Sequence, residues 1–332
     1  MVKILSFKTP YHREMGLLAK LWESLNYLDR FTKTFLVIFI GIIVTMPIIT
    51  TQLFDLRQRA EQEDISQSTP NDILIKYKTG ALEKNKKQLR NKYEITVSEE
   101  IKELNAERNH IKSLNKKSQI IEEIKQEKIV EYVEPNYIGK VQITKQENQI
   151  NQNEDYFGPE INIANPVPLA ILDTGTNYLL KTVKGYNFVN NNDNVTDSNG
   201  TGTFFTKAIT SVNKEIPIIP IKVGDTTDKI YFWNLARGVV FAANQGAKII
   251  LITAGADNDS QILQEAINYA YGKNAIIVSA AGDLGYRGIS SPAKLNNALA
   301  VGSLLTSGGR PEWSAVGPEL DFVTKGVNIN GH

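Results

Sequence analysis

The stretch Leu169-Ala170-Ile171-Leu172-Asp173-Thr174-Gly175 is an apolar run that ends in one carboxylate and a glycine. A short apolar run bounded by turn residues is typical of a buried strand. We therefore interpret it as a strand that delivers Asp173 into a glycine turn. Asp173 is a candidate catalytic acid.

Further apolar runs follow this strand and alternate with helical patterns. Strands are predicted over 166–173, 216–223, 248–253, 275–280 and 298–303. Helices are predicted over 229–245 and 259–271, and each is followed by a glycine, which is typical of a helix end. The alternation predicts an α/β domain over residues 161–332, with a parallel sheet and helices on both faces.

Composition limits the chemistry that the chain can perform. The 332 residues are 42% hydrophobic with a formal charge of +1, so the chain can form more than one domain and gives no indication of a nucleic-acid partner. The absence of cysteine excludes disulfides, a thiolate nucleophile and cysteine-ligated metals. The three histidines are His12, His110 and His332.

The N-terminal part predicts a membrane anchor over residues 35–54, because no charge occurs between Thr34 and Phe54. Such a run is about 30 Å long as a helix. Residues 1–34 hold six basic and three acidic residues, so we expect a cytoplasmic N-terminus and extracytoplasmic folded domains. The leader contains an amphipathic helical pattern, which indicates either a helix lying on the membrane or a simple helical extension. A cleaved signal peptide is the disfavoured alternative to the anchor.

Two linkers and a small domain follow the predicted anchor. Residues 55–70 form a polar linker and residues 141–160 a second connector. Between them, residues 71–140 show strand patterns at 73–77, 93–97, 109–114 and 129–137 and helical patterns at 81–93 and 117–126. This β-α-β-β-α-β order predicts a ferredoxin-like α+β domain.

Several segments, taken in order, resemble subtilisin-like serine proteases. Ile129-Val130-Glu131-Tyr132-Val133-Glu134-Pro135-Asn136 resembles the end of a subtilisin propeptide, whereas an unrelated small α+β domain is the alternative. Asp197-Ser198-Asn199-Gly200-Thr201-Gly202-Thr203-Phe204 is similar to D-x-N-G-H-G-T-H, with both histidines replaced. The segments 249–255, 279–285 and 313–321 are similar to the family's substrate strand, oxyanion turn and F-S-S-x-G-P-E-L-D segment. The resemblance implies a subtilisin-like fold preceded by an inhibitor-type propeptide domain.

The resemblance also assigns roles to individual positions. Asp173 takes the place of the triad acid, Thr201 that of the histidine and Asp283 that of the oxyanion asparagine. The segment Thr253-Ala254-Gly255 takes the place of the substrate-binding edge. The family's nucleophile segment, G-T-S-M-A, occurs nowhere in residues 1–332, so we interpret the domain as truncated before it. Ser279, Ser291 and Ser314 take structural positions of the family pattern.

These replacements predict that the chain does not hydrolyse peptides as given. A threonine hydroxyl is not a base near neutral pH, so Thr201 cannot take a proton from a serine. In subtilisin itself, loss of the base or the nucleophile slows turnover roughly a million-fold. An ionised Asp283 has no donor for an oxyanion, although a neutral one would have.

Three functional hypotheses follow from this sequence. The first is a degenerate, membrane-anchored homologue that binds a peptide or a partner protein. The alternatives are a fragment of a serine-type endopeptidase and a membrane-tethered inhibitor or chaperone that acts through residues 71–140. We expect no cofactor and no metal, and we expect apolar surface to be exposed around Val301 and Val323 because covering helices are missing.

Three other interpretations of single motifs remain. Asp173-Thr174-Gly175 is also the aspartic protease signature, which would need a second carboxylate from a homodimer. Gly200-Thr201-Gly202 is a weak match to a phosphate-binding loop, since no lysine follows. The run Asn190–Asn194 with Asp197 indicates either a calcium site or, more often for such a run, a solvated loop.

Overall fold

The computed structural model describes residues 67–141, 164–178, 183–305 and 307–326. All of these belong to one compact unit, Asp64–His332. Within these ranges, no helix has the length and apolar character needed to cross a membrane. The predicted anchor at 35–54, its leader and most of both linkers lie outside the described residues. The predicted domain boundaries therefore stay predictions.

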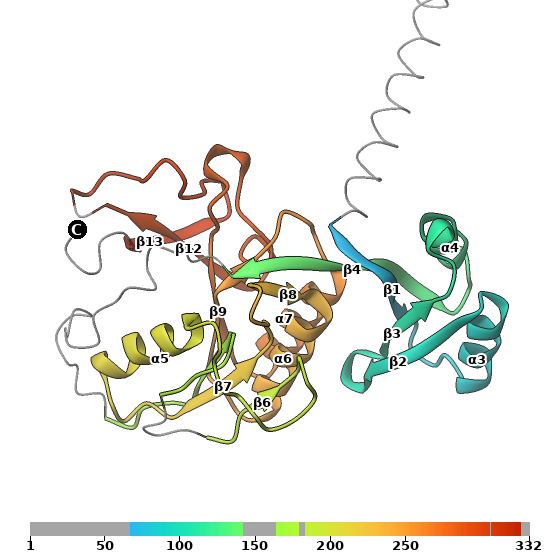
Figure 1. The fold of residues 1–332 in the computed structure, drawn as a ribbon, viewed down its shortest axis with the longest axis horizontal. Helices are drawn as coiled ribbons and strands as arrows, with labels where there is room; N and C mark the ends of the chain where they lie inside the picture. Colours follow the sequence, from blue (N-terminus) through green and yellow to red (C-terminus); the bar gives the residue numbers. More distant parts are fainter. Residues whose placement is uncertain (1–66, 142–163, 179–182, 306, 327–332) are drawn as a thin grey trace, which may run out of the picture. The chain divides into compact units, whose positions relative to one another are not determined.

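The first described region is a small α+β domain (Figure 1). Its sheet is antiparallel in the order β4-β1-β3-β2. The chain order of strands and helices is the predicted β-α-β-β-α-β. The elements are β1 (Ser68–Tyr77), α3 (Glu83–Lys92), β2 (Ile95–Ile101), the short 3-10 helix η1 (Lys102–Leu104), β3 (Ala106–Ile111), η2 (Leu114–Lys116), α4 (Lys117–Ile124) and β4 (Val130–Val141).

Side chains on the two faces of this sheet enter different cores. Ile73 and Ile75 point to one face and pack with Leu89 of α3 and Ile121 of α4. Leu74, between them in the strand, joins the core of the second region. The period-two alternation of a strand is the cause. This small domain is therefore covered on one face by its own helices and on the other by the rest of the chain.

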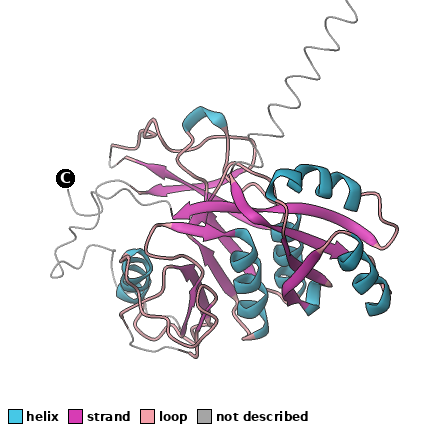
Figure 2. Cartoon of the chain, turned by 45° about the vertical axis from the view of Figure 1, so that its right-hand side comes forward, coloured by secondary structure: helices cyan, strands magenta, loops and turns pink. Residues whose placement is uncertain are grey.

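The second region is an α/β domain with a seven-stranded parallel sheet, in the order β13-β12-β11-β9-β5-β7-β6. Helices lie on both faces, as predicted (Figure 2). Its sheet strands are β5 (Leu169–Asp173), β6 (Tyr186–Asn187), β7 (Ile218–Lys222), β9 (Ile249–Ile252), β11 (Ile276–Ala280), β12 (Ala298–Leu304) and β13 (Leu320–Lys325). The helices are α5 (Thr201–Val212), α6 (Phe232–Asn244), α7 (Gln261–Gly272) and the short η4 (Gly285–Arg287).

Alternate strand residues again divide between two layers. Ala170 and Leu172 of β5 join the core that holds α6 and α7. Leu169 and Ile171 face the other way and pack near Phe205 and Ile209 of α5. The carboxyl end of β5 thus lies between the two helical layers, and this position places Asp173 in the interior.

Several elements differ from the sequence prediction, and two of these differences bear on the site described below. Residues 229–231 form the short strand β8 (Lys229–Tyr231) rather than the start of a helix, because they pair with β4 from the small domain. Helix α5 was not predicted, since four of its 12 residues are threonine and one is glycine, both of low helix propensity. Both differences arise from tertiary contacts that override local preference.

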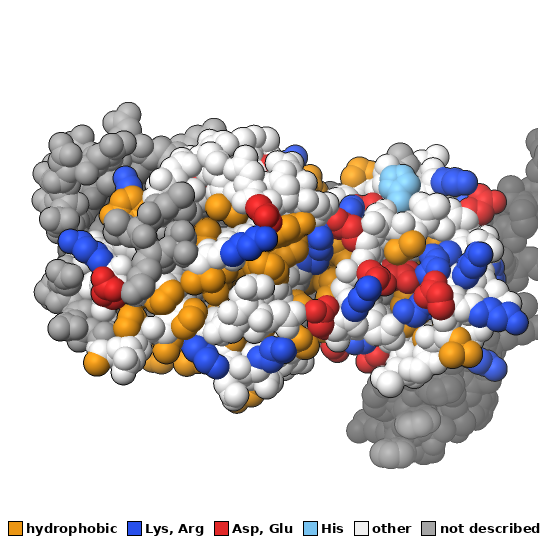
Figure 3. All heavy atoms as spheres, turned by 90° about the horizontal axis from the view of Figure 1, so that it is seen from below, with side chains coloured by type: hydrophobic (Ala, Val, Ile, Leu, Met, Phe, Trp, Pro, Cys, Tyr) orange, Lys and Arg blue, Asp and Glu red, His pale blue; other side chains and the backbone are white. Residues whose placement is uncertain are grey.

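The surfaces of the two regions differ in character. Figure 3 shows basic and acidic side chains mixed over the small domain on the right, while hydrophobic side chains extend across the left-hand domain. The edge strand β13 also exposes apolar side chains, since Phe322 is 59% and Val323 is 49% exposed. Val301 on β12 is partly exposed. The exposure expected at Val301 and Val323 is therefore present.

Replacing Phe322 and Val323 together by serine is expected to reduce binding of the dye ANS and self-association of the purified chain. The unfolding free energy should change by less than about 0.5 kcal/mol, because the two side chains are exposed. Urea unfolding measures the second quantity. Ala300→Ser is the control, because this fully buried position should lose about 1–3 kcal/mol without a fall in ANS binding. Unchanged ANS binding in the double variant would contradict the expectation.

Candidate functional site

Asp173 lies at the end of β5 and is only 1% exposed. Hydroxyl groups surround its carboxylate. Thr201, the first residue of α5, donates its hydroxyl to Asp173 Oδ1 at 2.6 Å, and Thr253 donates to Oδ2. The backbone N–H of Thr174 donates to Oδ1 at 2.6 Å. The structure therefore brings together the predicted acid, the predicted histidine position and one end of the predicted substrate edge.

The side chain of Thr174 connects Asp173 to a second carboxylate. Its Oγ1 lies 3.0 Å from Asp173 Oδ1, 2.9 Å from Asp197 Oδ1 and 2.9 Å from Thr201 Oγ1. Asp197 in turn accepts the backbone N–H groups of Asn199, Gly200 and Thr203 and so caps the start of α5. The cap explains why a helix begins at Thr201 and why its hydroxyl faces Asp173.

Two glycines allow this close approach of backbone segments. Gly175 has φ +107°, and a Cβ there would lie 2.3 Å from the carbonyl oxygen of Val195. A Cβ on Gly202 would lie 1.9 Å from the carbonyl oxygen of Gly175. A larger residue at Gly202 would push α5 away from the turn after β5, and one at Gly175 would displace the loop at Val195.

The electrostatics of the two carboxylates differ. Burial raises the pKa of Asp173 above its ordinary value, and the hydrogen bonds from Thr201 and Thr253 only partly oppose this. For Asp197, burial also acts to raise the pKa, but the hydrogen bonds from Gly200 and Thr203 outweigh it and lower the pKa. The groups around Asp173 are hydroxyls and an amide, which orient a carboxylate and donate hydrogen bonds to it but accept no proton near neutral pH.

The predicted substrate edge is occupied by the chain itself. Strand β4 continues past the small domain and lies between β8 and β10 (Ala254–Gly255). Val141 pairs with Ala254, and Lys140 pairs with Gly255, in antiparallel register. On the other side, Gly139 pairs with Ile230. Residues 138–141 therefore fill the space between β8 and β10 as an extended peptide would, and we call this space the groove.

The segment fits closely at Gly139. A Cβ there would lie 3.0 Å from the carbonyl oxygen of Gly255 and 3.1 Å from the ring of Phe232. Gly139 and Val141 are buried, whereas Lys140 between them is exposed. The groove thus accepts a residue without a side chain at one inward position and a β-branched residue at the next inward position.

The remaining predicted positions do not join this cluster. Asp283 lies exposed in the turn after β11, and no interaction joins it to Asp173 among the described residues. Ser279 and Ser291 are fully buried. The hydroxyl oxygen of Ser314, which is also buried, accepts the backbone N–H of Ser303. None of the three serines is placed to act as a nucleophile on a peptide in the groove.

The alternative interpretations of the motifs find no support in the geometry. A carboxylate from a second chain has no access to Asp173, because that residue is buried. Both oxygens of Asp197 accept N–H and O–H groups, and side-chain oxygens of Asn187, Asn192 and Asn194 accept backbone amides of their own loop. No group of three or more His, Cys, Asp or Glu side chains that could hold a metal ion occurs in the described parts of the chain.

Sequence reasoning missed several residues that build this site. The bridging role of Thr174 and the capping role of Asp197 were not predicted, although an aspartate two residues before Asn-Gly is a known pattern for side chains that cap turns. Strand β8 was also missed. It has only three residues, and its partner in β4 lies about ninety residues away in the sequence.

The sequence model of the subtilase family matches residues 166–332, which is half of the chain. This chain belongs to the subtilase family. The model of the fervidolysin N-terminal prodomain matches residues 57–136. The small domain is therefore a propeptide domain of the kind expected from Ile129–Asn136, and we call it the prodomain below.

Individual relatives agree with this assignment. The chain is 28% identical over 233 residues to the thermophilic serine proteinase of Bacillus sp. (strain AK1), covering 63% of this chain and 58% of that protein. It is 31% identical over 174 residues to subtilisin Savinase of Lederbergia lenta, covering 49% and 65%. The chain thus spans about half to two thirds of the length of these curated relatives.

Solved structures show the same fold. Fervidolysin from Fervidobacterium pennivorans, described as a keratinolytic enzyme related to subtilisin, aligns with a TM-score of 0.62 and 18% identity, covering 78% of this chain and 47% of that chain. The epidermin leader peptide processing serine protease from Staphylococcus aureus, as its S393A mutant, aligns with a TM-score of 0.59 and 18% identity, covering 77% and 76%. At this identity the similarity concerns the fold alone.

Proposed function

We propose that this chain is a membrane-anchored subtilase homologue that does not hydrolyse peptides and that binds an extended peptide or partner segment in the groove between β8 and β10. The observation that carries the proposal is the set of hydrogen bonds at Asp173. Thr201 occupies the position of the base and uses its hydroxyl as a donor to the acid. The site is a stable polar cluster with no group to start acyl transfer.

The groove supports the binding half of the proposal. Exposed strand edges bind extended peptides through main-chain hydrogen bonds, and alternate side chains give selectivity. Here residues 138–141 already make those pairings on both sides. A ligand from another chain must displace them, so the peptide class that fits is one with a glycine and a β-branched residue separated by one position.

Membrane attachment is part of the proposal and rests on the sequence. The uncharged run at 35–54 supports a single crossing, and the basic excess in residues 1–34 supports a cytoplasmic N-terminus. The prodomain and the subtilase domain would then lie on the extracytoplasmic side.

The purified full chain is expected to cleave no casein and to take up no fluorophosphonate label. The physical reason is the missing base at Thr201, which alone slows turnover roughly a million-fold in subtilisin. Gel fluorescence and intact mass spectrometry measure the label, and an active subtilisin treated in parallel shows that the reagent works. Covalent labelling of this chain at a rate near that of the control would overturn the proposal.

A second candidate is a serine-type endopeptidase of which this sequence is one part. Coverage favours it, because the chain spans only 58% of the Bacillus sp. serine proteinase. Genomic sequence beyond codon 332 tests it, and a G-T-S-M-A segment there would support it. Thr201 argues against activity even then. Inhibition of a second protease by residues 71–140 is less favoured, because that face of the prodomain is already engaged by the chain's own subtilase domain.

A further inference from the structure

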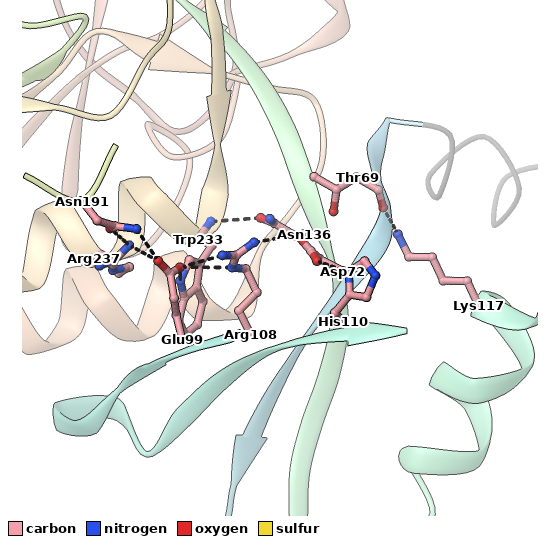
Figure 4. A network of polar contacts seen from close by, with 10 residues as sticks. All are labelled: Thr69, Asp72, Glu99, Arg108, His110, Lys117, Asn136, Asn191, Trp233 and Arg237. Atoms are coloured by element: carbon pink, nitrogen blue, oxygen red, sulfur yellow. Dashed lines mark hydrogen bonds and ion pairs between the residues drawn. The ribbon is translucent and has the colours of Figure 1, made fainter. Parts of the chain in front are cut away.

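The prodomain and the subtilase domain share a partly buried polar cluster around Glu99 (Figure 4). Glu99 belongs to β2, the edge strand of the prodomain sheet, and its side chain is 16% exposed. The pairing of β2 with β3 shifts by one residue between Val97 and Glu99. Such a bulge redirects the following side chain. It turns Glu99 toward α6 of the subtilase domain.

Both carboxylate oxygens of Glu99 are used across the interface. Oε1 accepts Arg237 Nη1 at 2.9 Å and Asn191 Nδ2 at 3.0 Å. Oε2 accepts the indole N–H of Trp233 at 2.7 Å and, from its own domain, Arg108 Nε at 3.1 Å. Four donors on one partly buried carboxylate form a set in which loss of the acceptor leaves several donors unpaired.

The two partners on α6 have a fixed spacing. Trp233 and Arg237 are four residues apart, so they lie one helical turn apart on the same face. Trp233 is fully buried, and the guanidinium of Arg237 stacks 4.7 Å from the ring of Phe188. Arg237 also donates to Asn191. Contacts within the subtilase domain therefore also hold both donors.

Other side chains also meet across the interface: Lys76 pairs with Glu265 at 3.2 Å, Glu103 accepts Asn244 Nδ2 at 2.8 Å, and Glu134 accepts the hydroxyl of Ser260 at 2.7 Å. Glu134 accepts the backbone N–H groups of Gln261 and Ile262 at the start of α7, and Asn136 accepts the backbone N–H of Trp233 at the start of α6. Backbone amides are present in any helix start and carry little side-chain selectivity. Glu99 differs from these contacts because its one carboxylate accepts three side chains of the subtilase domain, two of them from α6.

We propose that Glu99 is a residue by which this prodomain selects its subtilase domain. The partner that this surface fits is a subtilase domain whose helix presents an indole N–H and a guanidinium one turn apart. Because β4 continues from the prodomain into the groove, the same contact holds residues 138–141 in place.

The test uses hydrogen exchange of the full chain, read at two places. The amides of residues 138–141 report undocking, and those of the β1–β3 ladder report folding of the prodomain itself. Glu99→Ala is expected to speed exchange at 138–141 roughly tenfold or more and to leave the ladder unchanged. Glu100→Ala is the matched control, because Glu100 is exposed and pairs only with exposed Lys102. If Glu99→Ala does not fold, Glu99→Gln takes its place in the same test, because glutamine has the same shape as glutamate.

Double variants test the chemistry of the partner. Arg237→Gln and Trp233→Phe should each speed exchange at 138–141 in the native background and add little in the Glu99→Ala background. Three outcomes would overturn the proposal: Glu99→Ala behaving as Glu100→Ala, equal acceleration in the β1–β3 ladder, or full additivity with both partner variants. None involves an external peptide, so failure here leaves the peptide-binding proposal separately testable.

Discussion

Replacing Gly139 by valine is expected to expel residues 138–141 from the groove between β8 and β10. The Cβ alone would lie 3.0 Å from a backbone carbonyl oxygen of Gly255, and the two methyl groups of valine add further overlap with Phe232. Overpacking of this kind costs about 1–3 kcal/mol where neighbours can move, and a backbone carbonyl moves little. Loss of the strand pairing is the easier way to relieve the clash.

Two measurements test the expected effect of Gly139→Val. Hydrogen exchange at residues 138–141 should rise toward the rate of a free chain, and Lys140→Val should leave it unchanged because Lys140 is exposed. A fluorescent synthetic peptide with the sequence of residues 136–141 should bind the Gly139→Val chain far more tightly than the native chain, where the site is filled. An emptied groove that binds no peptide would contradict the proposed function.

The order of strands and helices could be predicted because it depends on local patterns. The alternation at Ile73, Ile75 and Tyr77 indicates a strand without knowledge of its partner strands. The apolar runs of the parallel sheet indicate strands in the same way. Strands β8 and β10 could not be found in this way. They have three and two residues, and pairing with β4 alone makes them strands.

The candidate site, too, could be predicted only where it depends on local sequence. Resemblance to the family located Asp173, Thr201 and Thr253, because each lies within a recognisable segment. It did not show that the two threonine hydroxyls both donate to the aspartate, since this requires β5, β9 and the start of α5 to meet. Glu99 could not be predicted either, because its partners Trp233 and Arg237 lie in the other domain and its orientation depends on a bulge.

Removal of the acceptor at Asp173 is expected to destabilise the fold by about 2–4 kcal/mol. In Asp173→Ala, the hydroxyls of Thr201 and Thr253 and the amide of Thr174 lose their buried partner, and each unpaired donor costs about 1–3 kcal/mol before rearrangement. Asp173→Asn keeps an acceptor oxygen and should retain most of the stability. Urea unfolding of the three chains measures the difference.

The pH dependence distinguishes the charge of Asp173 from its hydrogen bonds. Burial raises its pKa in the folded chain above the ordinary value of 3.8, so the folded state binds this proton more readily than the unfolded state. The stability contributed by Asp173 is therefore fully present below pH 3.8 and is lost as the pH rises through the folded pKa. Asparagine does not titrate. The unfolding free energy of Asp173→Asn relative to the native chain should thus increase from pH 3.8 upward and level off above the folded pKa, and a difference that instead falls with pH would show that the three hydrogen bonds outweigh burial.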